Sequence, residues 1–110
     1  MKIDILGTEY EMLFQTDQEN IKLKDSNGLC EQYSKEIIIE NPDVYNDEPM
    51  AVSNIKEFTN KVIRHEIIHA FLGESGLRNN SEWAQNEEMV DWVAIQFPKI
   101  QKVFEKLNCI

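Results

Sequence analysis

Cysteine, proline and glycine are all scarce in this sequence of 110 residues, which contains two, three and four of them respectively. So few glycines and prolines exclude collagen-like chains and proline-rich linkers. The two cysteines, Cys30 and Cys109, lie far apart and outside any CxxC spacing, so they predict reduced thiols rather than a disulfide. Hydrophobic residues make up 42% and charged residues 28% of the chain, which is typical of one small globular domain over residues 1–110.

Long apolar runs are missing as well. None approaches the roughly 20 residues that are needed to cross a bilayer. The first seven residues include an aspartate, Asp4, and they lack the apolar core of a signal peptide. We therefore expect a cytoplasmic protein without a membrane-spanning segment.

Positive charge is also in short supply, with 11 basic against 20 acidic residues and a net charge of −9. The lysines are scattered and form no basic patch. A chain this acidic is repelled by phosphate backbones and by anionic lipid surfaces. The composition therefore disfavours nucleic acids and membranes as partners.

The first half of the chain has the alternating pattern of β-strands. Residues 36–40 are the clearest case, because three isoleucines stand between two glutamates and Asn41–Pro42 then ends the strand. The turn residues 25–28 predict a hairpin that pairs residues 21–24 with residues 29–33. Two further strands are expected at residues 3–5 and 10–14, and a loop at residues 41–52. These segments predict a small, mostly antiparallel sheet.

A helix is predicted after this loop. Asn54 and Glu57 form a capping box, with Ser53 as the alternative cap, and the apolar periodicity then continues to about Leu72. Gly73 is expected to end the helix. The chain therefore changes from strands to helices near its middle, which predicts an α+β fold.

Two more helices are expected after a polar loop at residues 73–80. Ser81 would cap the first of them, which runs to about Phe97. Pro98 suits the first turn of the other. That last helix would have an apolar face formed by Ile100, Val103, Phe104 and Leu107.

The predicted first helix contains an HExxH sequence, residues 65–69. At about 100° per residue, His65 and His69 project about 40° apart, so both rings point the same way and can grip one metal ion. Glu66 projects about 60° beyond His69, beside the direction of the metal. A general base that acts on metal-bound water needs this position.

Two observations favour a metal site over a pair of ordinary core histidines. The chain has only two histidines, and random placement would give this spacing with a glutamate after the first in roughly 0.2% of cases. All three polar side chains also fall on the apolar arc of the helix. Burying them without partners would cost several kcal/mol, and a bound metal removes that cost.

A catalytic zinc site needs a third protein ligand and an open position for water. No further histidine exists, so this ligand must be a carboxylate, and the second predicted helix offers Glu87 and Glu88. Glu87 is favoured because it shares a face with Asp91 and with the apolar stripe expected to pack on the first helix. Glu88 is the alternative. Asp91 would then accept a hydrogen bond from the outer nitrogen of His65 and fix its tautomer.

HEIIH, followed 17 positions later by NEEMVD, resembles the HExxH and NExxxD pattern of gluzincin-type zinc metallopeptidases. The chain is also similar to small metallopeptidase-like proteins of phages and mobile elements, and more distantly to the ImmA/IrrE group, which cuts repressor proteins. The resemblance implies that His65, His69 and Glu87 bind Zn²⁺, that Glu66 is the catalytic base, and that Asp91 orients His65. It also implies a minimal zincin-like fold.

The sequence departs from that family at the group that stabilises the oxyanion, usually a further histidine or tyrosine. Tyr10, Tyr33 and Tyr45 all precede the motif. Tyr33 and Tyr45 could reach the site from a strand or a loop, and Arg64 and Arg78 are the other candidates. The sequence leaves this role open.

We thus expect a zinc-dependent peptidase in which Glu66 acts as general base on a metal-activated water. Its partner would be a peptide or protein substrate, for example a phage or host regulator. The strand at residues 36–40 would be either the sheet edge beside the cleft or an interior strand. The main alternative is a weak or inactive zincin-like domain that acts as a protein-binding module. A closed structural metal site ranks last, because no further histidine exists to close it.

Overall fold

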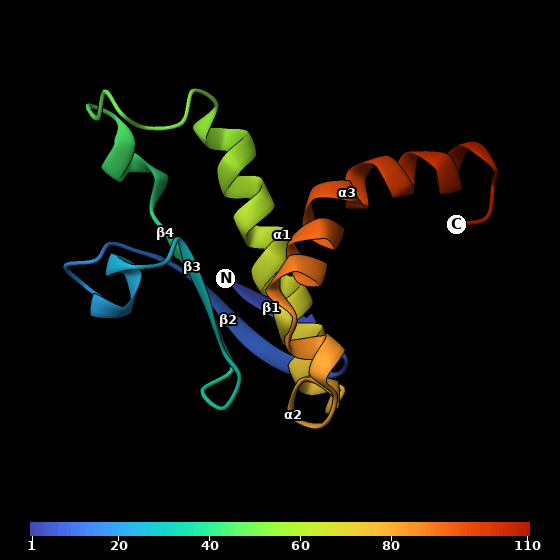
Figure 1. Cartoon of the computed structure of the whole chain (residues 1–110). Helices are drawn as coiled ribbons and strands as arrows, with labels where there is room; N and C mark the ends of the chain where they lie inside the picture. The colour runs from blue at the N-terminus through green and yellow to red at the C-terminus, as the bar shows by residue number, and fades with distance from the viewer.

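The computed structural model describes all 110 residues and confirms the α+β class (Figure 1). Its four strands are β1 (Lys2–Ile5), β2 (Thr8–Gln15), β3 (Gly28–Glu31) and β4 (Glu36–Glu40). They form one sheet in the order β1-β2-β4-β3. The β1–β2 and β3–β4 pairs are antiparallel, but β2 and β4 run parallel. The sheet is therefore mixed, although most of its pairings are antiparallel as expected.

The strand at residues 36–40 is an interior strand, so the alternative that made it the sheet edge is wrong. β4 lies between β2 and β3, and Ile37, Ile38 and Ile39 are all buried. A run of isoleucines without alternation suits a strand that is covered on both faces. The sheet edge on this side is β3 instead.

The predicted hairpin between residues 21–24 and 29–33 is also wrong. Ile21–Lys24 forms a 3₁₀ helix, η1, in which the Lys22 amide donates to the Asn20 side chain at 3.1 Å and Leu23 is buried. The hairpin instead joins β3 to β4. Its turn contains Lys35 with a φ of 58°. The alternation of residues 21–24 is too short to separate a β-strand from a 3₁₀ helix. The burial of Leu23 favours the 3₁₀ helix.

The long helix α1 (Ile55–Glu74) begins as predicted, with the Asn54 side chain accepting a hydrogen bond from the Glu57 amide at 3.3 Å. It does not end at Gly73. This glycine is buried inside the last turn, where a Cβ would stand 3.1 Å from the Gln32 side chain. Gly73 therefore permits close packing, and the chain turns at Gly76, whose φ is 84°.

The two helices predicted after residue 80 are a single helix, α3 (Glu87–Lys106). It begins at Asn86, whose side chain accepts from the Met89 amide at 2.8 Å, and not at Ser81. Two short helical segments precede it, α2 (Leu77–Asn80) and η3 (Glu82–Gln85). Another, η2 (Pro42–Tyr45), lies in the predicted loop after β4.

Pro98 lies inside α3 because a distant residue compensates for it. Proline lacks the N–H that would bond to the carbonyl four residues earlier, which belongs to Ala94. The Nε of Arg64 on α1 donates to that carbonyl at 2.6 Å. Arg64 thus satisfies the carbonyl that Pro98 leaves free.

The elements form three layers, with α1 between the sheet and α3. Ile5, Tyr10 and Ile39 of the sheet pack in one core with Val62 and Ala70 of α1. Val90 and Ala94 of α3 are fully buried, and α3 packs on α1. No helix is both long and apolar enough to span a bilayer.

The C-terminal end of α1 is tied to the sheet by Glu74. Its carboxylate accepts hydrogen bonds from Thr8 Oγ1 at 2.6 Å, Tyr10 Oη at 2.8 Å and Lys35 Nζ at 2.9 Å. These hydrogen bonds, with the positive charge of Lys35, lower the pKa of Glu74 to about 2. The contacts hold the C-terminal end of α1 against the sheet.

Candidate metal centre

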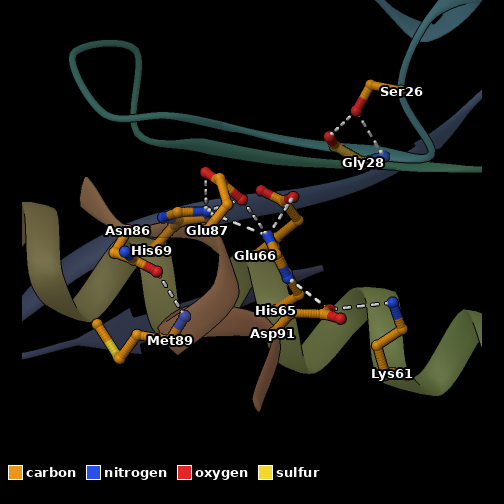
Figure 2. A network of polar contacts seen from close by, with 10 residues as sticks. All are labelled: Ser26, Gly28, Lys61, His65, Glu66, His69, Asn86, Glu87, Met89 and Asp91. Carbon is orange, nitrogen blue, oxygen red and sulfur yellow. Dashed lines mark hydrogen bonds and ion pairs between the residues drawn. The ribbon is translucent and has the colours of Figure 1, made fainter. Parts of the chain in front are cut away.

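Two helices bring the predicted ligands together (Figure 2). His65 and His69 lie one turn apart on α1, and Glu87 is the first residue of α3. The Nε2 atom of His65 lies 2.9 Å from one Glu87 carboxylate oxygen, and Nε2 of His69 lies 2.9 Å from the other. The two Nε2 atoms are 3.2 Å apart. The three side chains therefore converge on one point.

The three side chains could hold a metal ion, and the separation of the two Nε2 atoms is one that a tetrahedral zinc ion would accept. Zinc–nitrogen bonds of about 2.0–2.1 Å place two tetrahedral ligand atoms about 3.3 Å apart, close to the separation of the Nε2 atoms. The His65 and His69 side chains are only 16% and 5% exposed, whereas that of Glu87 is 67% exposed. The cluster is therefore buried on the α1 side and open on the α3 side, as an exchangeable fourth position requires.

Glu87, and not Glu88, is the carboxylate in this cluster. The Glu88 side chain is exposed, and the ion-pair contacts with the two histidines are made by Glu87. Partial burial raises the pKa of Glu87, but the contacts with His69 and His65 outweigh it and lower the pKa overall. Burial also lowers the pKa of His69, which favours the neutral imidazole that a metal ligand needs.

Glu66 is buried beside the cluster and does not belong to it. Its nearest carboxylate oxygen is 4.0 Å from His65 Nε2. Desolvation raises its pKa to about 7, and the negative charge of Glu87 adds to this effect, while His65 and Arg78 oppose it. A carboxyl group that titrates near neutrality can both accept and donate a proton. Its position agrees with the general base expected from the motif.

Asp91 lies on the outer side of His65, where the sequence placed it. Its Oδ1 is 3.0 Å from His65 Nδ1 and 3.0 Å from Lys61 Nζ. A carboxylate only accepts hydrogen bonds, so Nδ1 donates to Asp91, and the neutral ring would then have Nε2 free to bind a metal. Partial burial opposes ionisation of Asp91, but the hydrogen bonds from Lys61 and His65 outweigh it and lower its pKa.

Replacing Asp91 with asparagine is expected to weaken zinc binding by about 10–100-fold, because His65 loses the acceptor that fixes its tautomer. Competition with a chromogenic chelator measures this affinity. Lys61→Gln is the matched control, since it removes the other partner of Asp91 and leaves the contact with His65 in place. Equal losses in both variants, or none in Asp91→Asn, would contradict the role of Asp91.

The buried carboxyl of Glu66 also predicts how the metal-free chain responds to pH. Its pKa rises from 4.5 to about 7 on folding, so its stabilising protonated form is lost as pH rises through that range. At pH 8, ionisation of the buried carboxyl lowers the free energy of unfolding by about 3 kcal/mol. Urea unfolding in the presence of a chelator measures this effect. Between pH 4 and pH 8, the free energy of unfolding of Glu66→Gln should rise relative to that of the unmutated chain. Parallel stability profiles of the two chains would contradict this.

A polar cleft opens beside the cluster. One cavity of about 430 Å³ extends from His65, His69 and Glu66 to β3, and another of about 510 Å³ lies beside Glu87. Arg78 of α2 lines both. Its guanidinium has no acidic partner within ion-pair distance, although the chain has 20 acidic residues.

Arg78 is the only one of the open oxyanion candidates that lines the cleft. Tyr33 is 85% exposed and Tyr45 is hydrogen-bonded to Glu40. Tyr10, which was not favoured, bonds to Glu74. Arg64 lies on the opposite side of α1 against α3. The sequence had no signal to separate Arg78 from Arg64, because the turn at Gly76 that brings α2 back to the cleft depends on tertiary packing.

Comparisons with protein-family models, with curated proteins and with solved structures find no match for this chain. The resemblance to gluzincins therefore rests on the two motifs.

Proposed function

We propose that this chain is a zinc-dependent peptidase that hydrolyses peptide bonds with a metal-activated water. The observation that carries the proposal is the convergence of His65, His69 and Glu87 within 2.9–3.2 Å, with the unliganded carboxyl of Glu66 beside them. A structural metal needs no such neighbour. A hydrolytic site needs a base, an open position and a cleft; the Glu66 carboxyl, the exposed side of the cluster at Glu87 and the cavity toward β3 would supply them.

When bound, Zn²⁺ would lower the pKa of a coordinated water and polarise the scissile carbonyl. His65, His69 and Glu87 would hold the ion, and Asp91 would keep His65 in the required tautomer. Glu66 would accept a proton from the attacking water and later return it to the leaving amine. Arg78 would donate a hydrogen bond to the substrate oxygen, on which negative charge develops.

The substrate would bind as an extended peptide along β3. The Glu40 amide bonds to the Asn27 carbonyl, so alternation turns the backbone groups of Gly28 and Cys30 away from β4. The Ser26 hydroxyl bonds to both backbone groups of Gly28, so an added strand would have to displace it there (Figure 2). Residues 26 and 28–31 line the cavity that contains Glu66. An added strand would therefore run past the candidate metal centre. Gly28 lets β3 pack close to α1 at this point, because a Cβ there would stand 2.8 Å from Val62 and 3.0 Å from Glu66.

The proposal is tested with a mixture of unstructured peptides and the zinc-loaded chain. We expect cleavage that is lost with 1,10-phenanthroline and restored by zinc, with new termini identified by mass spectrometry. Cleavage that is insensitive to the chelator would come from a contaminant and would contradict the proposal. Peptide binding without cleavage by the zinc-loaded chain would favour the alternative, a zincin-like binding module.

A further inference from the structure

The C-terminal part of α3 leaves the body of the molecule. From Pro98 onward the helix projects into solvent, and every residue from 101 to 110 is exposed (Figure 1). The radius of gyration is 15.0 Å, whereas a compact chain of this length has about 13 Å. We refer to residues 98–110 as the arm.

The arm has an apolar face that nothing in the structure covers. Ile100, Val103, Phe104 and Leu107 recur at helical spacing on one side of it. The exposed fractions are 55% for Val103, 43% for Phe104 and 69% for Leu107. Apolar side chains gathered in this way normally mark a surface that binds another protein.

An apolar groove lies at the root of the arm, between α1 and α3. Its volume is about 570 Å³. Arg64 and, from the root of the arm, Pro98 and Gln101 line it together with five apolar residues, Ile67, Ile68, Phe71, Val93 and Phe97. The arm does not fill this groove, because α3 continues through Pro98 as one helix and points away from it. Each chain therefore carries both an apolar helix face and an empty apolar groove.

The charges of the arm and the body are complementary. The arm holds Lys99, Lys102, Lys106 and one acid, Glu105, for a net charge of +2. The remaining residues hold eight of the 11 basic and 19 of the 20 acidic side chains, for a net charge of −11. The three lysines lie together on the side next to the apolar face. Arg64 is the one charged residue that lines the groove, so the attraction would act between the basic arm and the acidic body as a whole.

We propose that the arm docks into the groove of a second copy of this chain, and that the second arm docks reciprocally to form a two-fold dimer. Such an interface is closed and self-complementary, because each copy supplies both parts. Six apolar side chains of the arm and the groove are 42–71% exposed: Phe71, Phe97, Val103, Phe104, Leu107 and Ile110. If each presents about 100 Å², they offer roughly 600 Å² of apolar surface per copy. A standard interface buries about 800 Å² per partner, and the groove residues and lysine stems supply more.

The dimer would leave the candidate metal centre open. Ile68 and Phe71 line the groove on a side of α1 away from His65 and His69, which face the cleft toward β3. The inference therefore does not depend on the proposed peptidase activity. Dimerisation is measured separately from peptide cleavage, so either result can fail without the other.

Sedimentation equilibrium of the full chain tests the proposal. We expect a dimer that dissociates to monomers when Phe104 and Leu107 on the arm are both changed to glutamate. These side chains project into solvent, so circular dichroism should show an intact fold. Lys99→Gln combined with Lys102→Gln is the control: it makes the charge more negative by the same amount and alters neither the apolar face nor the groove, so the dimer should weaken but persist.

A mixing experiment distinguishes docking into the groove from pairing of two arms. The double arm variant and a groove variant, Ile68→Glu, should each be monomeric alone. Together they keep one intact arm and one intact groove, so the mixture should form heterodimers. A monomeric unmutated chain at all concentrations, a dimer that ignores the arm variant, or a mixture that stays monomeric would overturn the proposal. So would a monomer whose arm instead binds vesicles of anionic phospholipid.

Discussion

A Glu66→Gln variant is expected to keep about one zinc ion per chain and to lose peptide hydrolysis by about 10²–10⁴-fold, the contribution typical of a general acid–base residue. Glutamine keeps the shape of the buried side chain but cannot accept the proton of the attacking water. Glu66 lies beside the ligand cluster, so its replacement should spare the metal. The measurements are metal content and the rate of peptide cleavage on the same sample.

Glu31→Gln is the matched control for this variant. Glu31 lines the same cavity from β3 but pairs with Lys22, at 2.6 Å, and not with the cluster. Its replacement should change the rate by only a small factor. Full activity in Glu66→Gln would contradict the proposed role of Glu66, whereas loss of zinc in that variant would place Glu66 among the ligands.

Glu87→Gln is expected to lower zinc affinity by more than the 10–100-fold that loss of an outer hydrogen bond costs, while Glu88→Gln leaves it unchanged. The two glutamates are neighbours in the first turn of α3, so the substitutions alter charge and helix dipole alike. Only Glu87 reaches the two Nε2 atoms. Competition with a chromogenic chelator gives both affinities. The opposite ranking would make Glu88 the third ligand.

Local signals predicted much of α1 and of the site. The Asn54 cap and the spacing of the two histidines depend only on helix geometry, which fixes neighbouring turns regardless of the rest of the fold. The choice of Glu87 over Glu88 followed from its face on the next helix, which buries Val90 and Ala94 against α1. Helical periodicity was therefore sufficient where one face of a helix packs against another.

The errors arose where distant residues decide the structure. Pro98 seemed to divide two helices, but Arg64, 34 positions earlier in the chain, donates to the carbonyl that the proline leaves free. Residues 21–24 alternate like a strand, but burial of Leu23 favours a 3₁₀ helix. Strand order likewise depends on the whole sheet, so the edge beside the cleft is β3 and not residues 36–40. No local pattern contains this information.

The most direct test of the account is X-ray diffraction at the zinc absorption edge, from crystals grown with zinc. We predict one anomalous peak at about 2.0–2.2 Å from His65 Nε2, His69 Nε2 and a Glu87 oxygen, with Glu66 outside bonding distance. The absence of a peak between these three side chains, or a peak held by other residues, would contradict the central claim.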